Sequence, residues 1–354
     1  MLKIGVIEGN GIGPEITKAT LEVLEATGLP FEWIQIPTAQ QSLERYGHPL
    51  APEVIQMIKE VKVSIKGPLI VEKQAGRINC VQPDGSEITY PSINNAIRRE
   101  LKLFVAPRPI RGFKGISGSF ERLDVVIMRE ITEDVYSALE HKIGDYAAEA
   151  IKLTTREAVV RVARFSFEYA RKHKRKKVTC VHKANALSYT DGLFLQCCRE
   201  VALEYPDILF EDFMVDATCY FMVKDPSKFD IIVTSNQYGD ILSDLAGGLV
   251  GSLGLAPGAN IGENCAVYEA SHGAAPDIAG KGIANPIALV LSGAEMLSNL
   301  GYPNEGKAIV EATHEVVSSG KTLTPDLGGT ASTTELTAAI VQMLKVKLHA
   351  TPTI

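Results

Sequence analysis

The sequence predicts an α/β protein with a largely parallel sheet. Short β-rich runs such as LKIGVI (2–7), LDVVIMR (123–129) and FDIIVTS (229–235) alternate along the chain with longer helical stretches. This rhythm is typical of folds in which helices cover a parallel sheet. The sequence contains no internal repeat, low-complexity segment or flexible linker, so a solenoid or a disordered chain is excluded.

The elements follow from the hydrophobic pattern. Strands are expected where β-branched residues cluster, and helices where apolar residues recur every three or four positions. The stretch 155–173, for example, carries Val160, Ala163, Phe167 and Ala170 on one face. The expected order is strand 2–7, helix 14–27, strand 61–67, helix 92–101, strand 123–129, helix 155–173, strand 176–183, helix 188–205, strand 229–235 and helix 286–300.

Length and charge limit the classes of protein that fit. The chain has 354 residues and 45% hydrophobic content. This length exceeds the ~250 to 300 residues at which one core stops growing, so two domains are expected. Without a linker, the chain must cross between them in compact turns, near 97–110 and 246–262. The net charge of −6 argues against a general nucleic-acid binder.

One block of like charge stands out. The residues RKHKRKK, 171–177, follow an amphipathic helix, and cations are favoured at the negative end of a helix dipole. We expect them to end that helix, and a polyanion-binding patch is the alternative. The start of the chain lacks a secretory signal and no apolar run approaches ~18 residues, so a soluble, cytoplasmic protein without membrane contact is expected. The six cysteines form no C-x-x-C pair and are interpreted as reduced packing residues.

The stretch VIEGNGIGPE, 6–15, places three glycines between a strand and a helix. Gly9 and Gly11 fit the dinucleotide fingerprint G-x-G-x-x-G, but Pro14 occupies its third position. No acidic residue closes the following apolar stretch, FEWIQIPTAQ, to bind the ribose. A classical Rossmann fold is therefore not expected. The stretch is expected to form a structural turn or another kind of nucleotide site.

Residues with carboxylate-binding chemistry cluster in the first half of the chain. Ser92, Asn94 and Arg98 stand in SINNAIRREL, followed by Arg108, and Arg129 ends a strand. A guanidinium group grips two carboxylate oxygens at once, so arginines that converge from strand and helix ends suit an anionic substrate. Any one of them alone also fits an ordinary surface position.

Other polar residues suggest a metal site and proton transfer. Asp240 and Asp244 lie one helical turn apart, where two carboxylates can share a divalent cation, although acids also favour a helix N-terminus. Asp216 stands among apolar residues and needs a partner. Lys183 follows a strand, and Tyr136 lies on an amphipathic stretch. These last two fit proton transfer, or equally a surface lysine and a packing tyrosine.

The segment EASHGAAPDIAGKGIANP, 269–286, combines small residues with His272, Asp277 and Asn285. Together with SNQYGDILSDLAGGLVG, it resembles the β-decarboxylating dehydrogenases, which comprise isocitrate, isopropylmalate, homoisocitrate and tartrate dehydrogenases. The resemblance runs from Lys3 to about Leu344. It implies an isocitrate/isopropylmalate dehydrogenase-like fold of two α/β domains with a central cleft. Residues 1–97 and 255–354 would form the large cofactor-binding domain, and 98–254 the small domain with the dimer interface and the metal aspartates.

The resemblance implies how a substrate would be held. The pattern S-x-N-x-x-x-R at 92–98 looks like the substrate loop of isocitrate dehydrogenases, whereas isopropylmalate enzymes carry an apolar residue in place of the serine. Ser92 and Asn94 would hold the distal carboxylate of isocitrate. Arg98, Arg108 and Arg129 would bind its other two carboxylates.

The same resemblance implies metal and catalytic roles. Asp216, Asp240 and Asp244 would surround Mg²⁺ or Mn²⁺. Asp216 and Lys183 would be supplied by the neighbouring subunit of a homodimer or larger homo-oligomer with shared active sites. Lys183 would assist removal of the C2 hydroxyl proton as hydride passes to NAD. After CO₂ is lost, Tyr136 would protonate the enolate to give 2-oxoglutarate.

The cofactor would lie along the loop 272–285 and beside the first turn. The implied contacts are Ile12, His272, Gly273, Ala275, Asp277, Ile278 and Asn285. An aspartate at 277 implies NAD, because it accepts hydrogen bonds from the adenosine ribose, whereas NADP-using relatives carry lysine and tyrosine at 277 and 278.

Two departures and two rivals accompany this assignment. Many isocitrate dehydrogenases have threonines where KGPLIV places Ile70 and Val71, and asparagine and glycine early in the segment that here reads EITEDVYSALEH. An isopropylmalate or homoisocitrate dehydrogenase is one rival, which the Ser92 and Asn94 pair disfavours. The other is a regulatory subunit of a hetero-oligomeric isocitrate dehydrogenase. Such chains tend to lose catalytic groups, which here are present.

Overall fold

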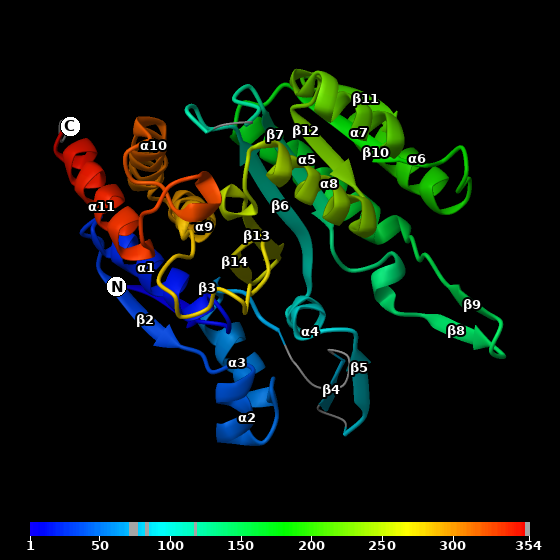
Figure 1. The fold of residues 1–354 in the computed structure, drawn as a ribbon. Helices are drawn as coiled ribbons and strands as arrows, with labels where there is room; N and C mark the ends of the chain where they lie inside the picture. Colours follow the sequence, from blue (N-terminus) through cyan, green and yellow to red (C-terminus); the bar gives the residue numbers. More distant parts are fainter. Residues whose placement is uncertain (71–76, 82–84, 117–118, 351–354) are drawn as a thin grey trace.

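A computed structural model describes residues 1–70, 77–81, 85–116 and 119–350. It confirms the α/β class, because helices surround one large sheet (Figure 1). Within the described residues this sheet has 10 strands in the order β11-β10-β12-β7-β6-β13-β14-β3-β1-β2. Their bounds are β1 Leu2–Ile7, β2 Phe31–Gln35, β3 Val63–Lys66, β6 Leu103–Arg111, β7 Asp124–Glu130, β10 Lys177–His182, β11 Leu209–Met214, β12 Ile231–Thr234, β13 Pro257–Gly262 and β14 Ala266–Ala270.

The sheet is parallel at both ends and antiparallel in the middle. The pairs β1·β2, β1·β3 and β3·β14 are parallel at one end, and β7·β12, β12·β10 and β10·β11 at the other. Between them β6, β7, β13 and β14 pair antiparallel. The two segments expected to cross between domains contribute β6 and β13, which are neighbours through Ile261 and Val105. The division into two domains at residues 97 and 255 stays a prediction.

The helices form two groups around this sheet. Figure 1 shows α1, α9, α10 and α11 near the β1 end and α5, α6, α7 and α8 near the β10 end. Their bounds are α1 Gly13–Glu25, α2 Gln40–Tyr46, α3 Pro52–Val61, α4 Ile93–Glu100, α5 Arg156–Lys172, α6 Thr190–Ala202, α7 Val215–Lys224, α8 Asn236–Leu249, α9 Ile287–Asn299, α10 Pro303–Ser319 and α11 Thr333–Ala350. Two small hairpins, β4 Ile78–Val81 with β5 Glu87–Tyr90 and β8 Glu140–Ile143 with β9 Ala147–Ala150, complete the fold.

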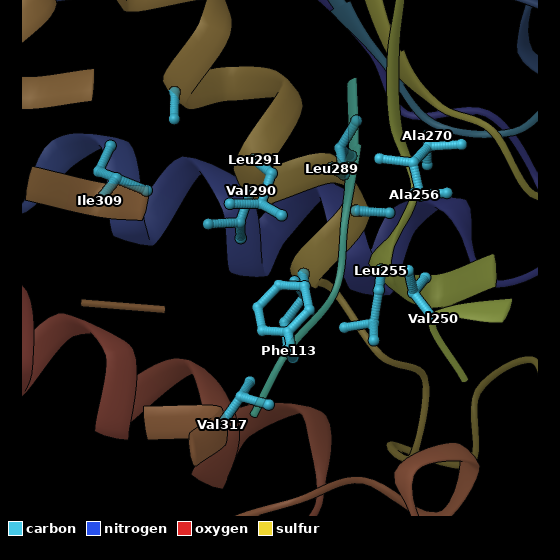
Figure 2. Packing of buried hydrophobic residues seen from close by; sticks show 14 of the residues in the cluster. Phe113, Val250, Leu255, Ala256, Ala270, Leu289, Val290, Leu291, Ile309 and Val317 are labelled. Atoms are coloured by element: carbon cyan, nitrogen blue, oxygen red, sulfur yellow. The ribbon is translucent and has the colours of Figure 1, made fainter. Parts of the chain in front are cut away.

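Helix α9 anchors the largest core. Most of its residues are buried, as expected of a helix that is apolar on all sides. Figure 2 shows Leu289 beside Ala256 and Ala270, with Ile309 of α10 close to the same helix. Ala270 ends β14, so this core supports one wall of the site described below. Replacing a buried leucine such as Leu289 by alanine typically costs about 2 to 5 kcal/mol.

Two arginines of the basic block 171–177 form ion pairs with carboxylates of this chain. Helix α5 ends at Lys172, close to the expected position. Arg171 pairs with Asp207 at 2.6 Å, and Arg175 pairs with Asp230 at 2.8 Å and with Asp124 at 2.5 Å. All six cysteines are free thiols, as predicted. No helix in the described parts of the chain is long and apolar enough to cross a membrane.

Candidate active site

A cavity of about 240 Å³ opens where the middle strands of the sheet meet α4 and α8. It is lined by polar groups from segments far apart in the sequence. The residues are Lys66, Pro68, Leu69, Ser92, Asn94, Asn95, Arg98, Arg108, Arg129, Tyr136, Asp240, Glu269, Ala270, Ser271, His272 and Gly273. The structure therefore brings together all five residues expected to hold the substrate, together with Tyr136 and Asp240.

Arg108 is the least compensated charge in this cavity. It lies on β6 with 5% of its surface exposed, and its Nε has no hydrogen-bond partner among the described residues. No carboxylate of the described chain forms an ion pair with it. Burial and the neighbouring Arg98 lower the pKa of the Arg108 guanidinium. A buried cation is costly unless it is paired, so this position calls for an anion from outside the chain.

Arg129 sits beside it in a different arrangement. Only 2% of the residue is exposed, its Nε donates to Asn236 at 2.9 Å, and its Nη1 binds Asp240. The Tyr136 hydroxyl donates to the other oxygen of Asp240 at 2.5 Å. Burial and the Asp240 carboxylate raise the pKa of Tyr136 to about 12. The tyrosine therefore carries its proton at neutral pH, as a proton donor must.

Helix α4 presents the serine and the asparagine. Ser92 is its N-cap and accepts a hydrogen bond from the backbone N–H of Asn95 at 3.1 Å. The hydroxyl proton stays available to donate into the cavity. Asn94 donates to the carbonyl of Leu69 at 3.2 Å, and its Oδ1 is buried without a partner in the described structure. The sequence S-x-N thus places in the cavity lining two polar groups that can still form hydrogen bonds.

A buried ion pair that the sequence reading missed also lines the cavity. Lys66 at the end of β3 binds Glu269 on β14, with side-chain exposures of 3% and 11%. Asn260 donates to Glu269 at 2.6 Å, and Arg98 lies 3.5 Å from it. Burial opposes ionisation of Glu269, but Lys66 and Arg98 outweigh it, so its pKa lies far below the usual value. A single charged residue inside each of the apolar runs VSIK and AVYEA was the available signal.

The three expected metal ligands are not together within one chain. Asp240 and Asp244 lie on α8 one turn apart, and partial burial together with the charge of Asp240 raises the pKa of Asp244. Two carboxylates that oppose each other's ionisation have the oxygen chemistry that suits Mg²⁺ or Mn²⁺. Asp216 instead pairs with Lys183 at 2.6 Å, and neither residue lines the cavity. No group of three metal-binding side chains occurs in the described ranges of a single chain.

The segment 272–285 adjoins the cavity and the first turn of the chain. His272 lines the cavity, and its Nε2 is buried without a partner among the residues described. Burial lowers the pKa of His272, so the imidazole is neutral at neutral pH. Asn285 is buried and donates to Asp326 at 2.9 Å, whereas Asp277 is exposed. An unpartnered ring nitrogen and an exposed carboxylate along one loop are compatible with a nucleotide cofactor.

The glycines near the N-terminus are explained by close packing, of Gly11 against this segment and of Gly9 against Pro68. A Cβ on Gly11 would stand 2.0 Å from the carbonyl oxygen of Ala274, and one on Gly9 would stand 2.1 Å from that of Pro68. Both residues have positive φ, 64° and 74°, which favours glycine. The Ile12 N–H donates to Ala274 at 2.9 Å. The turn therefore abuts the 272–285 loop closely, and its glycines are required without a phosphate.

Of the two departures noted in the sequence, Ile70 exchanges two hydrogen bonds with Asn10, at 2.6 and 2.8 Å. Val71 lies outside the described residues. The second departure, at 130–139, contributes Asp134 and Glu133. Both accept hydrogen bonds that hold the loop before Tyr136 in place.

The fold and this cavity define a dehydrogenase family. A family model described as isocitrate/isopropylmalate dehydrogenase matches residues 3–340. The chain belongs to this family, which confirms the resemblance seen in the motifs. It is 44% identical to a 3-isopropylmalate dehydrogenase of Archaeoglobus fulgidus, over 97% of this chain and 100% of that protein.

Proteins named as isocitrate dehydrogenases are about as similar to the chain. The chain is 42% identical to isocitrate dehydrogenase [NAD] catalytic subunit 5, mitochondrial, of Arabidopsis thaliana, over 95% of this chain and 87% of that one. The crystal structure of isocitrate dehydrogenase from Methylococcus capsulatus superposes with a TM-score of 0.89 and 43% identity, covering 98% of this chain and 100% of that chain. Overall similarity therefore leaves the choice of substrate to the residues of the cavity.

Proposed function

We propose that the protein catalyses the oxidative decarboxylation of isocitrate to 2-oxoglutarate and CO₂ with NAD as the hydride acceptor. The observation that carries this proposal is the buried Arg108, which forms no ion pair with a carboxylate of the described chain and lines the same cavity as Arg98 and Arg129. The described cavity lining contains four basic side chains and two carboxylates, so it attracts anions. A tricarboxylate would offer two carboxylates to the arginines. Its third carboxylate would accept a hydrogen bond from the Ser92 hydroxyl.

Residues on the described chain fit a divalent cation and a nicotinamide cofactor. Asp240 and Asp244, with Asp216 of a second copy, would hold Mg²⁺ or Mn²⁺, which when bound polarises the C2 hydroxyl and stabilises developing negative charge on oxygen. The loop 272–285 would hold NAD, with Asp277 at the adenosine ribose and His272 at the cavity. NAD supplies the hydride acceptor.

The chain's own groups then move the protons. Arg98, Arg108 and Arg129 hold the carboxylates so that the reacting carbons are fixed. The Lys183 amine takes part in removing the proton of the C2 hydroxyl. The Tyr136 hydroxyl, which keeps its proton at neutral pH, delivers it to carbon after CO₂ leaves.

These residue roles require a second copy of the chain, because Lys183 and Asp216 do not line the cavity of their own chain. Exposed apolar side chains on the helices that carry Asp216 and Asp240, and on the β8–β9 hairpin, support a dimer. Tyr220 and Val223 of α7 and Ile241 of α8 are 54%, 51% and 55% exposed, and Tyr146 in the β8–β9 hairpin is 85% exposed. Apolar surface of this kind marks a protein contact. We propose a homodimer with shared active sites.

Isopropylmalate is the second candidate substrate. Pro68, Leu69 and Ala270 give the cavity an apolar portion that would accept an isopropyl group, and the Archaeoglobus relative carries that activity in its name. Against it stand Ser92 and Asn94. Polar groups left unpaired against an apolar tail cost about 1 to 3 kcal/mol each.

The test is a steady-state panel of isocitrate, homoisocitrate, isopropylmalate and tartrate with NAD and NADP on the homodimer. We expect the highest kcat/KM for isocitrate with NAD. Ser92→Leu should lose isocitrate turnover by orders of magnitude, whereas Ser92→Thr, which keeps both the hydroxyl and the helix cap, should retain most of it. A higher kcat/KM for isopropylmalate in the unmodified protein would overturn the assignment. An inactive homodimer would point to the regulatory-subunit alternative.

A further inference from the structure

A buried lysine outside the cavity connects the two catalytic residues. Lys152, which follows β9, has 12% of its side chain exposed. Its ammonium donates to both oxygens of Asp134 at 3.0 Å and to Ser235 at 3.1 Å, and it lies 3.5 Å from Asp191. The ring of Tyr238 packs beneath it at 4.5 Å. Every side of the ammonium is therefore occupied by this chain.

One of its partners fixes the segment that carries Tyr136. Asp134 caps the short helix Val135–Ser137 and accepts from the Val135 N–H at 2.8 Å. It also accepts from the Gln237 N–H at 3.0 Å, in the first turn of α8, the helix that carries Asp240. The φ of Asp134 is 71°, a conformation that is unfavourable in a residue other than glycine and persists only where surrounding contacts impose it.

The other partner fixes the segment that carries Lys183. Asp191, at the start of α6, is 2% exposed, and its Oδ2 accepts from the Lys183 N–H at 2.6 Å. Its Oδ1 lies 3.5 Å from the Lys152 ammonium, and the Tyr238 hydroxyl interacts with the same carboxylate. Two carboxylates that are each 2% exposed thus share one ammonium as their cation in the described chain.

We propose that Lys152 is a positioning residue that fixes Tyr136 and Lys183 relative to each other within one chain. The inference rests on the proposed dimer, in which Tyr136 serves its own active site and Lys183 serves the partner's. The Asp134–Lys152–Asp191 triad then links the two active sites through each subunit. A buried ionic group holds its partners in one geometry, because any other arrangement leaves a carboxylate unpaired in a dry interior.

The first test is hydrogen exchange on the intact dimer of Lys152→Met. We expect exchange to rise at least tenfold in both 133–139 and 183–192 and to stay within twofold of the wild type in α9. Lys152→Gln, which can still donate to Asp134, is the milder variant should Lys152→Met fold poorly, and should show the same two segments at smaller amplitude. Lys18→Met, an exposed lysine on α1, is the matched control and should change neither segment.

The second test uses dimers of one Lys152→Met chain and one wild-type chain, purified through two different tags. The variant homodimer should lose kcat at least tenfold while KM for isocitrate stays within threefold, because Ser92, Asn94 and Arg98 lie outside the triad. In the mixed dimer one site has a displaced Tyr136 and the other a displaced Lys183. If the two lesions contribute equally and their effects multiply, a tenfold loss in the homodimer corresponds to about a third of the wild-type activity in the mixed dimer, and a larger loss to less. If Lys152 positioned only one of them, one site would stay intact and about half the activity would remain.

Exchange that rises in only one of the two segments, or equally in α9, would overturn the proposal. A mixed dimer with half the wild-type activity would do the same. Failure of the proposed function is a separate result. It would appear as a wild-type dimer that turns over neither isocitrate nor isopropylmalate, and the exchange experiment would still decide whether the triad couples the two segments.

Discussion

Arg108→Met should weaken substrate binding and leave the fold at least as stable. Arg108 is buried without a carboxylate partner among the described residues. Burying an unpaired cation carries a desolvation cost of several kcal/mol, which methionine avoids while filling similar space. The nearby positive charge of Arg98 adds to this cost. We therefore expect the free energy of unfolding to stay the same or to rise by about 1 to 3 kcal/mol.

The loss of function follows from the same feature. A hydrogen bond to a charged group contributes about 1.5 to 3 kcal/mol, and every 1.4 kcal/mol is a factor of ten, so KM for isocitrate should rise roughly 10- to 150-fold. Isocitrate should raise the melting temperature of the wild type through preferential binding to the folded state. The same concentration should leave Arg108→Met unshifted.

Arg129→Met is the matched control, because Arg129 is as deeply buried but bonded to Asn236 and Asp240. Its removal leaves the Asn236 Oδ1 without this donor and Asp240 without its cation, and should destabilise the fold by about 1 to 3 kcal/mol. Denaturant unfolding at one protein concentration and steady-state kinetics measure both quantities. The reasoning is wrong if Arg108→Met destabilises the protein as much as Arg129→Met does while KM stays unchanged.

Three further results are expected. Tyr136→Phe and Lys183→Met homodimers should both be slow, and refolding them together should restore about a quarter of the sites; mixed dimers as inactive as their parents would show that both groups act within one chain. NAD should be preferred over NADP by at least about tenfold in kcat/KM, and Asp277→Lys should narrow that ratio; equal values in the unmodified protein would remove Asp277 from the role. The depressed pKa of Glu269 stabilises the fold above the pKa of the unfolded carboxyl, and this contribution declines as pH falls through the acid range. Glu269→Gln should thus be much less stable at pH 7, where Lys66 loses its partner, and the gap should shrink below about pH 5 in denaturant titrations; a gap independent of pH would contradict the linkage.

Local pattern was enough for the fold class and for much of the site. Alternating β-rich and helical stretches predicted the α/β architecture, and α5 and α9 lie within a few residues of their expected bounds. The motif at 92–98 and the positions of Arg108, Arg129 and Tyr136 predicted residues that all line one cavity. These residue types are informative because a polar group next to an apolar run has few structural uses.

Pairing across the chain was not readable from local pattern. The glycine-rich stretch 246–262 hides β13. Pro257–Gly262 has a single β-branched residue, Ile261, and its neighbours in the sheet define the strand instead. Likewise, the pairing of Lys66 with Glu269 joins positions 203 residues apart. Propensity acts over a few residues, whereas these contacts depend on how distant strands are ordered.

The sequence by itself predicted which side chains would carry the chemistry, because residue type and local spacing suffice to single out candidate carboxylate-binding and acid–base groups. Only the tertiary structure decided how their charges are compensated. Among the described residues it leaves the Arg108 Nε without a hydrogen-bond partner, pairs Arg129 with Asp240, and separates Lys183 and Asp216 from the cavity of their own chain. The physical reason is that compensation of a buried charge depends on distance in three dimensions, and the groups that provide it come from strands and helices remote in sequence.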